Sequence, residues 1–199
     1  MNLEIILVLS LITLIILIIS ILILNFVGSL KSERLNAEYL AIRVSYLLDR
    51  FVDDCVMVIN DDGLSKGRRN HSGCCEVQVT TPELKFDLPD VNWHSINCVT
   101  VLEILSFPGH IEAANQLIDK TFEHSAFPPN YDEGFEERQF QYAKLGLRAG
   151  ELASNLRRTH GLPERECQVW DPIEYMKKQK QEISDLRFQL HSALKTDPI

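Results

Sequence analysis

The chain has no charged side chain from residue 5 to residue 30 and no proline in its first 81 residues. Missing charge excludes an ordinary solvated segment, and missing proline lets a helix continue without interruption. An apolar run fills this stretch; it begins at Ile5 and ends at Leu24. About 20 such residues in a helix cross the ~30 Å hydrocarbon core of a bilayer. The sequence therefore predicts a transmembrane helix, with the lipid bilayer as a partner.

No Lys or Arg precedes the run, although a cleaved signal peptide typically begins with basic residues and has a shorter apolar core. A cleavage site at residues 27–29 (Val-Gly-Ser) keeps the signal peptide as an alternative. A buried core helix is the other alternative, but such a helix rarely needs apolar residues on every face. A retained transmembrane helix is the favoured interpretation.

Basic residues near the ends of a span stay on the cytoplasmic side. Lys31 and Arg34 follow the run, and only the α-amino group precedes it. We therefore expect a single-pass protein with its N-terminus outside and its C-terminal domain in the cytoplasm. Residues 1–29 would be the transmembrane anchor and residues 30–199 the soluble domain.

The formal net charge is −8, and nearly all the acidic residues lie after the run. An acidic surface repels phosphate backbones, so nucleic acid is not expected as a partner. A short basic group at residues 177–180 is interpreted as a solvated helix face.

Apolar residues that recur every three or four positions predict four amphipathic helices. These helices cover about 33–59, 94–123, 133–160 and 171–195, and an irregular loop occupies 60–92. Residues 77–80 within that loop alternate well enough for a short strand. Such helices bury their apolar faces most simply as an antiparallel bundle. The predicted fold class is therefore all-α: a single transmembrane helix followed by an antiparallel four-helix bundle-like soluble domain.

Two of the predicted helices have informative apolar stripes. Pro108 in the second helix predicts a kink or a break into two helices. The expected stripe of that helix is Val101 or Leu102, Leu105, Ile111, Ala114, Leu117 or Ile118, and Phe122. The stripe of the third helix is Arg138, Tyr142, Leu145, Ala149, Leu152 and Leu156.

An up-down bundle would place the turn at residues 125–132 near the bilayer. The loops at 64–92 and 161–170 would then meet at the end of the domain far from the membrane. If a partner binds, we expect it at this end. The candidate partner-binding residues are Arg68, Arg69, Arg165 and Trp170.

No motif fixes a reaction: a glycine-rich phosphate loop, a nucleophile elbow, a His-Glu-x-x-His pair and a Glu-x-x-His pair are all missing from the sequence. The best metal candidate is His71 with Cys74 and Cys75, which Cys167 would join across the far end of the bundle. Tetrahedral zinc accepts this ligand set, but structural zinc sites usually show two separated ligand pairs. We therefore predict neither a metal, a cofactor nor a catalytic residue.

The preferred functional hypothesis is a membrane-tethered helical module that binds another protein, as a scaffold, adaptor or regulator. One alternative is a membrane-tethered enzyme, or a metal or thiol site, that uses the Cys and His residues of the loop. Another is an envelope structural protein whose helices self-associate. Hydroxyl groups in the span can hydrogen-bond to a second helix, which leaves a homo-oligomer open. These groups belong to Ser10, Thr13 and Ser20.

Overall fold

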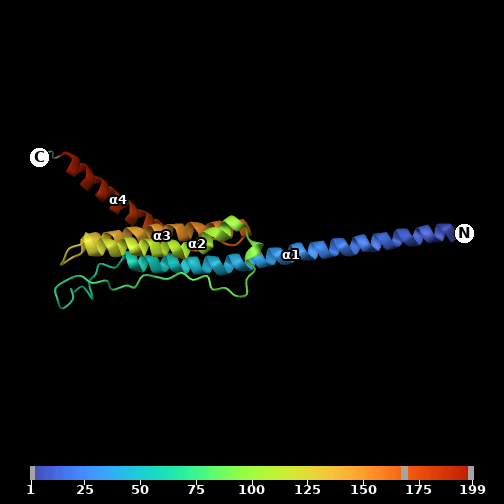
Figure 1. The fold of residues 1–199 in the computed structure, drawn as a ribbon, viewed down its shortest axis with the longest axis horizontal. Coiled ribbons are helices and arrows are strands. Elements are labelled where there is room, and N and C mark those ends of the chain that lie inside the picture. The colour runs from blue at the N-terminus through green and yellow to red at the C-terminus, as the bar shows by residue number, and fades with distance from the viewer. Residues whose placement is uncertain (1–2, 167–169, 197–199) are drawn as a thin grey trace.

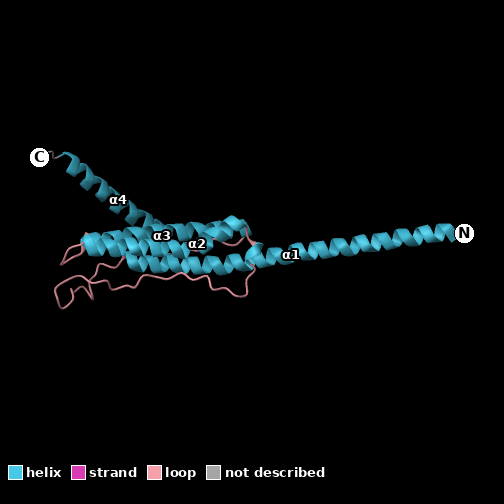
Figure 2. Cartoon of the chain, viewed as in Figure 1, coloured by secondary structure: helices cyan, strands magenta, loops and turns pink. Residues whose placement is uncertain are grey.

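All regular secondary structure in the described residues, 3–166 and 170–196 of a computed structural model, is helical (Figure 2). The elements are α1 (Leu3–Ile59), the short 3₁₀ helix η1 (Trp93–Ser95), α2 (Cys98–His124), α3 (Asp132–His160) and α4 (Pro172–Thr196). This confirms the all-α fold class. Residues 77–80, whose alternation would suit a short strand, belong to the irregular connection that was expected at 60–92, and the described residues hold only an isolated bridge between Ser65 and Arg68.

α1 is one uninterrupted helix of 57 residues, about 85 Å long at 1.5 Å per residue. It continues as a helix through Gly28. Its N-terminal part projects from the rest of the molecule (Figure 1). Every side chain from residue 11 to residue 36 is exposed, and burial begins at Ala37. The apolar part of α1 is long enough to cross a membrane, and none of it is used as a core helix.

The helices end where local sequence chemistry ends them. Gly63, with φ of +73°, follows α1, and Gly161, with φ of +65°, closes α3 in the left-handed region that glycine adopts readily. At the start of α4, the backbone N–H of Ile173 donates to Oδ1 of Asp171 at 2.8 Å. Asp171 is therefore the N-terminal cap that the Asp-Pro-Ile-Glu sequence indicates.

α3 is the central helix, and the other three helices run opposite to it. Along each contact, residue numbers rise on α3 as they fall on the neighbouring helix. The pairs are Asp61 with Arg138 and Asp49 with Arg157 for α1, Phe122 with Phe135 and Asn115 with Tyr142 for α2, and Arg187 with Glu137 for α4. It follows that α1, α2 and α4 all point the same way.

This order corrects the up-down topology expected from sequence. The connection after α1 runs back along the domain, so that η1 and the start of α2 lie beside the part of α1 where burial begins (Figure 1). The turn at residues 125–131 consequently lies at the far end, where the backbone N–H of Cys75 donates to the carbonyl of Pro129 at 2.8 Å. A connection of more than 30 residues reaches the full length of a helix easily, because each extended residue spans about 3.3 Å.

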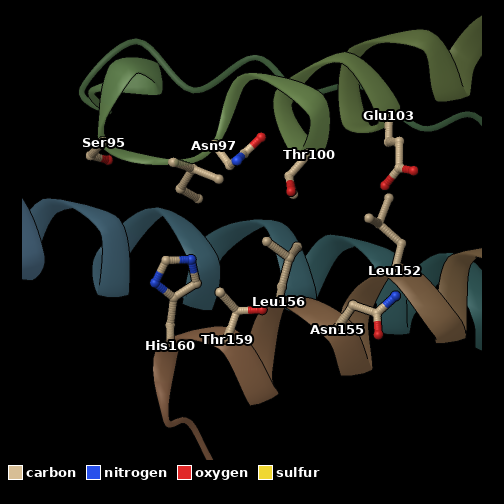
Figure 3. Close-up of a pocket in the computed structure, with 10 residues that line it drawn as sticks. Ser95, Asn97, Thr100, Glu103, Leu152, Asn155, Leu156, Thr159 and His160 are labelled. Atoms are coloured by element: carbon tan, nitrogen blue, oxygen red, sulfur yellow. The ribbon is translucent and has the colours of Figure 1, made fainter.

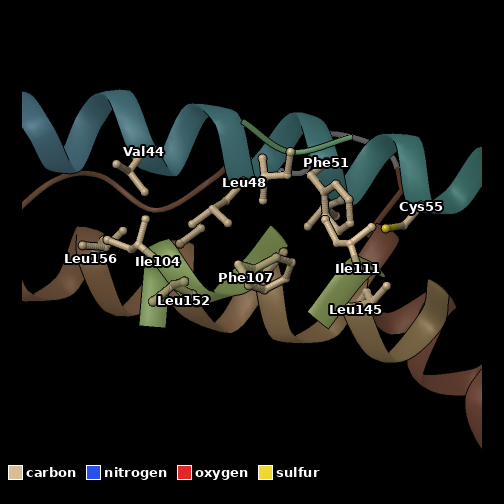
Figure 4. Packing of buried hydrophobic residues seen from close by; sticks show 14 of the residues in the cluster. Val44, Leu48, Phe51, Cys55, Ile104, Phe107, Ile111, Leu145, Leu152 and Leu156 are labelled. Carbon is tan, nitrogen blue, oxygen red and sulfur yellow. The ribbon is translucent and has the colours of Figure 1, made fainter. Parts of the chain in front are cut away.

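The core fills the space between α1, α2 and α3 (Figure 4). Phe51 of α1 meets Phe107 of α2 edge-to-face, with ring centroids 5.6 Å apart. The six stripe residues expected for α3 are all buried, which confirms that stripe. The stripe expected for the first half of α2 is right only at Val101, which is half-buried against the core: Leu102 and Leu105 are exposed, and Ile104 is buried with Phe107.

α2 also continues through Pro108, so of the two outcomes expected there, a kink or a break, the break does not occur. A proline inside a helix costs roughly 3 kcal/mol. Ile104 and Phe107 before it, and Ile111 and Ala114 after it, enter the same core and are all buried. Burial of these side chains, at about 1.5–3 kcal/mol for each large one, offsets that cost.

Candidate partner-binding end

The far end of the domain is built around a buried ion pair. Arg138 of α3 donates from Nη1 to Oδ2 of Asp61 at 2.8 Å, and both side chains are almost completely buried. Asp61 also accepts backbone N–H groups from Gly63 at 3.0 Å and from Gln78 and Val79 at 2.9 Å each. Arg138 donates further to the carbonyl of Val79. The pair therefore ties the loop after α1 to the first turns of α3.

These contacts decide the charge state of Asp61. Burial alone would raise the pKa of its carboxyl group. Hydrogen bonds from the N–H groups of Val79, Gly63 and Gln78, together with the positive charge of Arg138, outweigh burial and lower the pKa below its ordinary value. Asp61 is consequently ionised at neutral pH and acts as a structural anion.

A second set of contacts joins the same loop to the turn between α2 and α3. The N–H of Glu76 donates to the carbonyl of Gly63 at 2.9 Å, and Arg69 donates to the side-chain oxygen of Asn130. The ring of Phe135 lies where a Cβ on Gly63 would have to be, so the loop crosses α3 closely at this glycine. The loop is thus held from both sides.

One exposed segment at this end is basic, and the exposed carboxylates of Asp62 and Glu76 flank it. Residues 63–75, which we call the distal basic loop, contain three Lys or Arg residues and no carboxylate, in a chain of net charge −8. The charged side chains, together with His71, are exposed: Lys66, Arg68 and Arg69. Phe127 of the adjoining turn is 69% exposed. Positive charge and an exposed aromatic ring therefore occur on neighbouring segments at the end of the domain farthest from the span.

The structure does not bring the four predicted partner-binding residues together. Arg68 and Arg69 lie on the distal basic loop, but Arg165 donates to Oδ1 of Asp53 at 2.6 Å, part-way along α1. The ring of Trp170 packs against that of Tyr175 on α4, with centroids 5.5 Å apart. The reason is topological: α3 ends beside the start of α2, at the opposite end of the domain, and Arg165 lies beside Asp49 and Asp53 of α1.

Sequence reasoning missed two members of this surface. Lys66 precedes Arg68 in the same loop, and its positive charge was visible in the sequence. Phe127 follows a helix end, and nothing in the sequence distinguished it from a core residue.

The candidate metal ligands do not converge in the described residues. Across residues 3–166 and 170–196, no three His, Cys, Asp or Glu side chains form a group that could hold a metal ion. His71 is exposed, whereas Cys74 and Cys75 are half-buried. Cys167, the fourth candidate, lies outside the described residues.

A small pocket lies between the start of α2 and the end of α3 (Figure 3). Its volume is about 160 Å³, and its polar lining includes Thr100, Glu103 and His160. Pockets that enclose organic ligands usually measure about 300–1,000 Å³. The pocket therefore suits a few water molecules better than a substrate.

The outer half of α4 forms another exposed surface. Arg187 donates to Glu136 and Glu137 of α3 at 2.7 Å each, and it lies over the ring of Phe140 at 4.6 Å. The C-terminal part of α4 diverges from the bundle (Figure 1). Three large apolar side chains are exposed near this point: Leu186, Phe188 and Leu190.

Comparison of the chain with protein-family models, with curated proteins and with solved structures finds no significant match in any of the three. The argument for a function consequently depends on the geometry alone.

Proposed function

We propose that the protein is a single-pass membrane protein that displays a helical protein-interaction module, as a scaffold, adaptor or regulatory subunit. In this proposal residues 1–29 are the anchor, and residues 30–199 form a bundle-like domain in which α3 runs antiparallel to its neighbours. The observation that carries the proposal is the continuity of α1, which belongs to the apolar span at one end and to the domain core at the other.

The orientation in the membrane follows from charge. Lys31 and Arg34 lie next to the span on the domain side. Under the positive-inside rule this favours a cytoplasmic domain. A reporter fused after Ile199 should be active in the cytoplasm, and activity only outside it would overturn this part of the proposal.

The distal basic loop is the proposed docking site, and its partner is a protein with an acidic surface. About 35 residues of α1 separate Leu24 from Ile59, a rise of about 52 Å. The Debye length at physiological salt is only ~8 Å. Lipid headgroups beside the span are therefore too distant to attract the loop, and a soluble acidic surface is the chemistry that fits it.

The test is proximity labelling from the intact, membrane-anchored chain, repeated with the double variant Lys66→Glu/Arg68→Glu. We expect the variant to lose its strongest labelled partners by tenfold or more. The matched control is Lys177→Glu/Lys178→Glu on α4, which makes the same charge change on another exposed basic pair. Equal loss from both variants, or no loss from the first, would overturn the docking site.

The double variant Cys74→Ser/Cys75→Ser distinguishes the interaction module from the rival hypothesis of a tethered enzyme or a metal or thiol site. An interaction module should tolerate both substitutions and keep its labelled partners. Stoichiometric zinc in the purified protein, lost in this variant, would favour the rival.

A further inference from the structure

The domain part of α1 has two apolar faces, and the bundle uses only one. Leu40, Val44 and Leu48 point into the core and are fully buried. On the opposite side, Leu35, Tyr39, Ile42 and Tyr46 are 47–62% exposed. The exposed face is as regular as the buried one, with spacings of four, three and four residues.

This exposed face continues toward the membrane with the same spacing. We call the whole set the α1 seam: Asn25, Gly28, Ser32, Leu35, Tyr39, Ile42 and Tyr46. Alternating steps of three and four give the 3.5-residue repeat of a left-handed coiled coil. Nothing lies within 4 Å of a Cβ built on Gly28, so a second helix can approach closely there.

Lipid cannot cover the upper part of the seam. Tyr39 lies 15 residues beyond the end of the apolar run at Leu24, about 22 Å farther along the helix. The headgroup layer adds only about 5–8 Å to each side of the hydrocarbon core. A protein surface is therefore needed to remove Tyr39, Ile42 and Tyr46 from water.

We infer that the α1 seam pairs with the seam of a second copy of this chain in a parallel, twofold-symmetric coiled coil. This inference rests on the membrane anchoring in the proposed function. Anchoring in one bilayer gives both copies the same direction and the same height, so identical positions of the two seams meet. Such a self-complementary contact is what a twofold dimer requires.

Charges beside the seam match this arrangement. With Tyr39 and Tyr46 at the first core position of the heptad, Glu38 occupies position g and Arg43 position e. In a parallel pair, a g residue meets the e residue five places later on the other helix, so Glu38 of each copy meets Arg43 of the other. In the single chain these groups make only exposed contacts one turn away: Glu38 with Arg34 and Arg43 with Tyr39.

The seam also has a defined end. Asp49 and Asp53 continue the spacing but are paired with Arg157 and Arg165 of their own chain. Facing carboxylates at core positions would repel each other across a twofold axis. The coiled coil therefore extends from about residue 25 to residue 46.

The test is disulfide crosslinking of the full-length chain in membranes. All cysteines except the buried Cys55 are first replaced by Ser, at positions 74, 75, 98 and 167. Leu35→Cys or Ile42→Cys is then added to this background and oxidised mildly. We expect a dimer band at least fivefold stronger than that from Arg34→Cys, which lies beside Leu35 but about 100° around the helix and is 80% exposed.

A second control addresses the other exposed apolar stripe. Leu102→Cys on α2 is 68% exposed in the native chain and should crosslink no more than Arg34→Cys. Crosslinking at Leu102→Cys equal to or stronger than that at Leu35→Cys would overturn the α1 seam, as would seam variants that do not exceed Arg34→Cys.

Charge exchange provides an independent readout. Glu38→Arg or Arg43→Glu alone should weaken the Ile42→Cys crosslink severalfold, and the two together should restore it. Failure of the double exchange to restore the crosslink would overturn the proposed pairing. Alkaline carbonate washing separates the two proposals: a chain released by the wash contradicts the anchor itself, whereas a retained chain without seam crosslinks contradicts only the dimer.

Discussion

The two halves of α1 are one helix in two environments. In the N-terminal half, from residue 11 to residue 36, every side chain is exposed and the large apolar ones occur on all sides. In the half from Ala37 to Ile59, buried apolar residues occupy one side, and charged residues such as Arg50 and Asp54 occupy another. Within one helix, a segment that is apolar on all sides, up to Leu30, is thus followed by an amphipathic segment that begins at Ala37.

The comparison teaches what each half needs from its surroundings. A helix that is apolar on all sides is stable only where its whole surface is away from water, which a bilayer provides. An amphipathic helix has apolar side chains on one side only, and packing that side against a protein core removes them from water. The transition occurs at residues 31–37, where Lys31 and Arg34 appear and the first core residue follows.

The largest effect is expected from charged residues introduced into the N-terminal half of α1, which should prevent its insertion into a membrane. Ile15→Arg/Ile16→Arg should cost about 5–7 kcal/mol of insertion free energy, since each Arg near the centre of a span costs about 2.5–3.5 kcal/mol. Alkaline carbonate washing should then move the chain from the membrane pellet to the supernatant. Leu102→Arg/Leu105→Arg, on the exposed face of α2, is the control and should stay in the pellet. Retention of the first variant would contradict the transmembrane assignment.

The next prediction compares the effect on domain stability of replacing one phenylalanine in each half of α1. Phe51 is 2% exposed and Phe26 is 66% exposed. Phe51→Ala should lower the free energy of unfolding of the domain by about 3–5 kcal/mol, because it leaves a cavity against Phe107. Phe26→Ala should change it by less than about 0.5 kcal/mol. Urea unfolding in detergent micelles, followed by circular dichroism, measures both, and similar losses would mean that the two halves are not energetically separate.

The far end of the second half can be tested at Asp61. Asp61→Asn leaves Arg138 buried without its counter-ion and should cost about 3 kcal/mol of unfolding free energy, at the low end for a broken buried pair because Asn keeps one acceptor. Asp62→Asn is the neighbouring control: Asp62 is exposed and accepts only the N–H of Leu64, at 2.9 Å. A loss from Asp62→Asn as large as that from Asp61→Asn would contradict this account.

The same variant has a pH signature. Because the pKa of Asp61 is lowered by folding, its contribution to stability is complete above the ordinary carboxyl pKa of about 4. That contribution is lost as the pH falls through the lowered value. The unfolding free energy of Asp61→Asn should therefore depend less on pH below about 4 than that of the native chain. If the unfolding free energy of Asp61→Asn depends on pH below about 4 as strongly as that of the native chain, a group other than Asp61 causes the dependence.

The smallest expected effect is a difference in reactivity between a buried thiol on α1 and an exposed thiol on α2. Burial, with a minor contribution from Asp54, raises the pKa of the Cys55 thiol well above its ordinary value. Cys98, at the start of α2, is exposed. In native protein at pH 8, a thiol reagent should modify Cys98 promptly and Cys55 only after unfolding. Mass spectrometry of digested samples reads each site, and early labelling of Cys55 would show that the second half of α1 is not packed as described.

Much of the fold could be predicted because its signals are local. The helix ends lie close to the predicted bounds because each depends on neighbouring residues: Asn-Asp-Asp-Gly follows Ile59, Gly161 closes α3 and Asp171 caps α4. The stripe of α3 was predicted correctly because the sequence offers one strong choice, which the structure buries.

The candidate site was predicted only in part, because its members depend on chain direction. Arg68 and Arg69 lie at the far end in the structure, but Arg165 lies part-way along α1 beside Asp53. The direction of α2 determines which turn accompanies the distal basic loop. A connection of more than 30 residues is compatible with either direction, so spacing could not decide it.

By itself, the sequence determined the apolar span, the helical class and the ends of the helices, because each depends on the composition or capping chemistry of a short stretch. The tertiary structure decided which of two apolar stripes α2 buries. Leu102 with Leu105, and Ile104 with Phe107, are equally apolar and similarly spaced, so periodicity could not rank them. Only the shape of the space beside Phe51 and α3 distinguishes the pairs, since burial is favourable where side chains pack without voids.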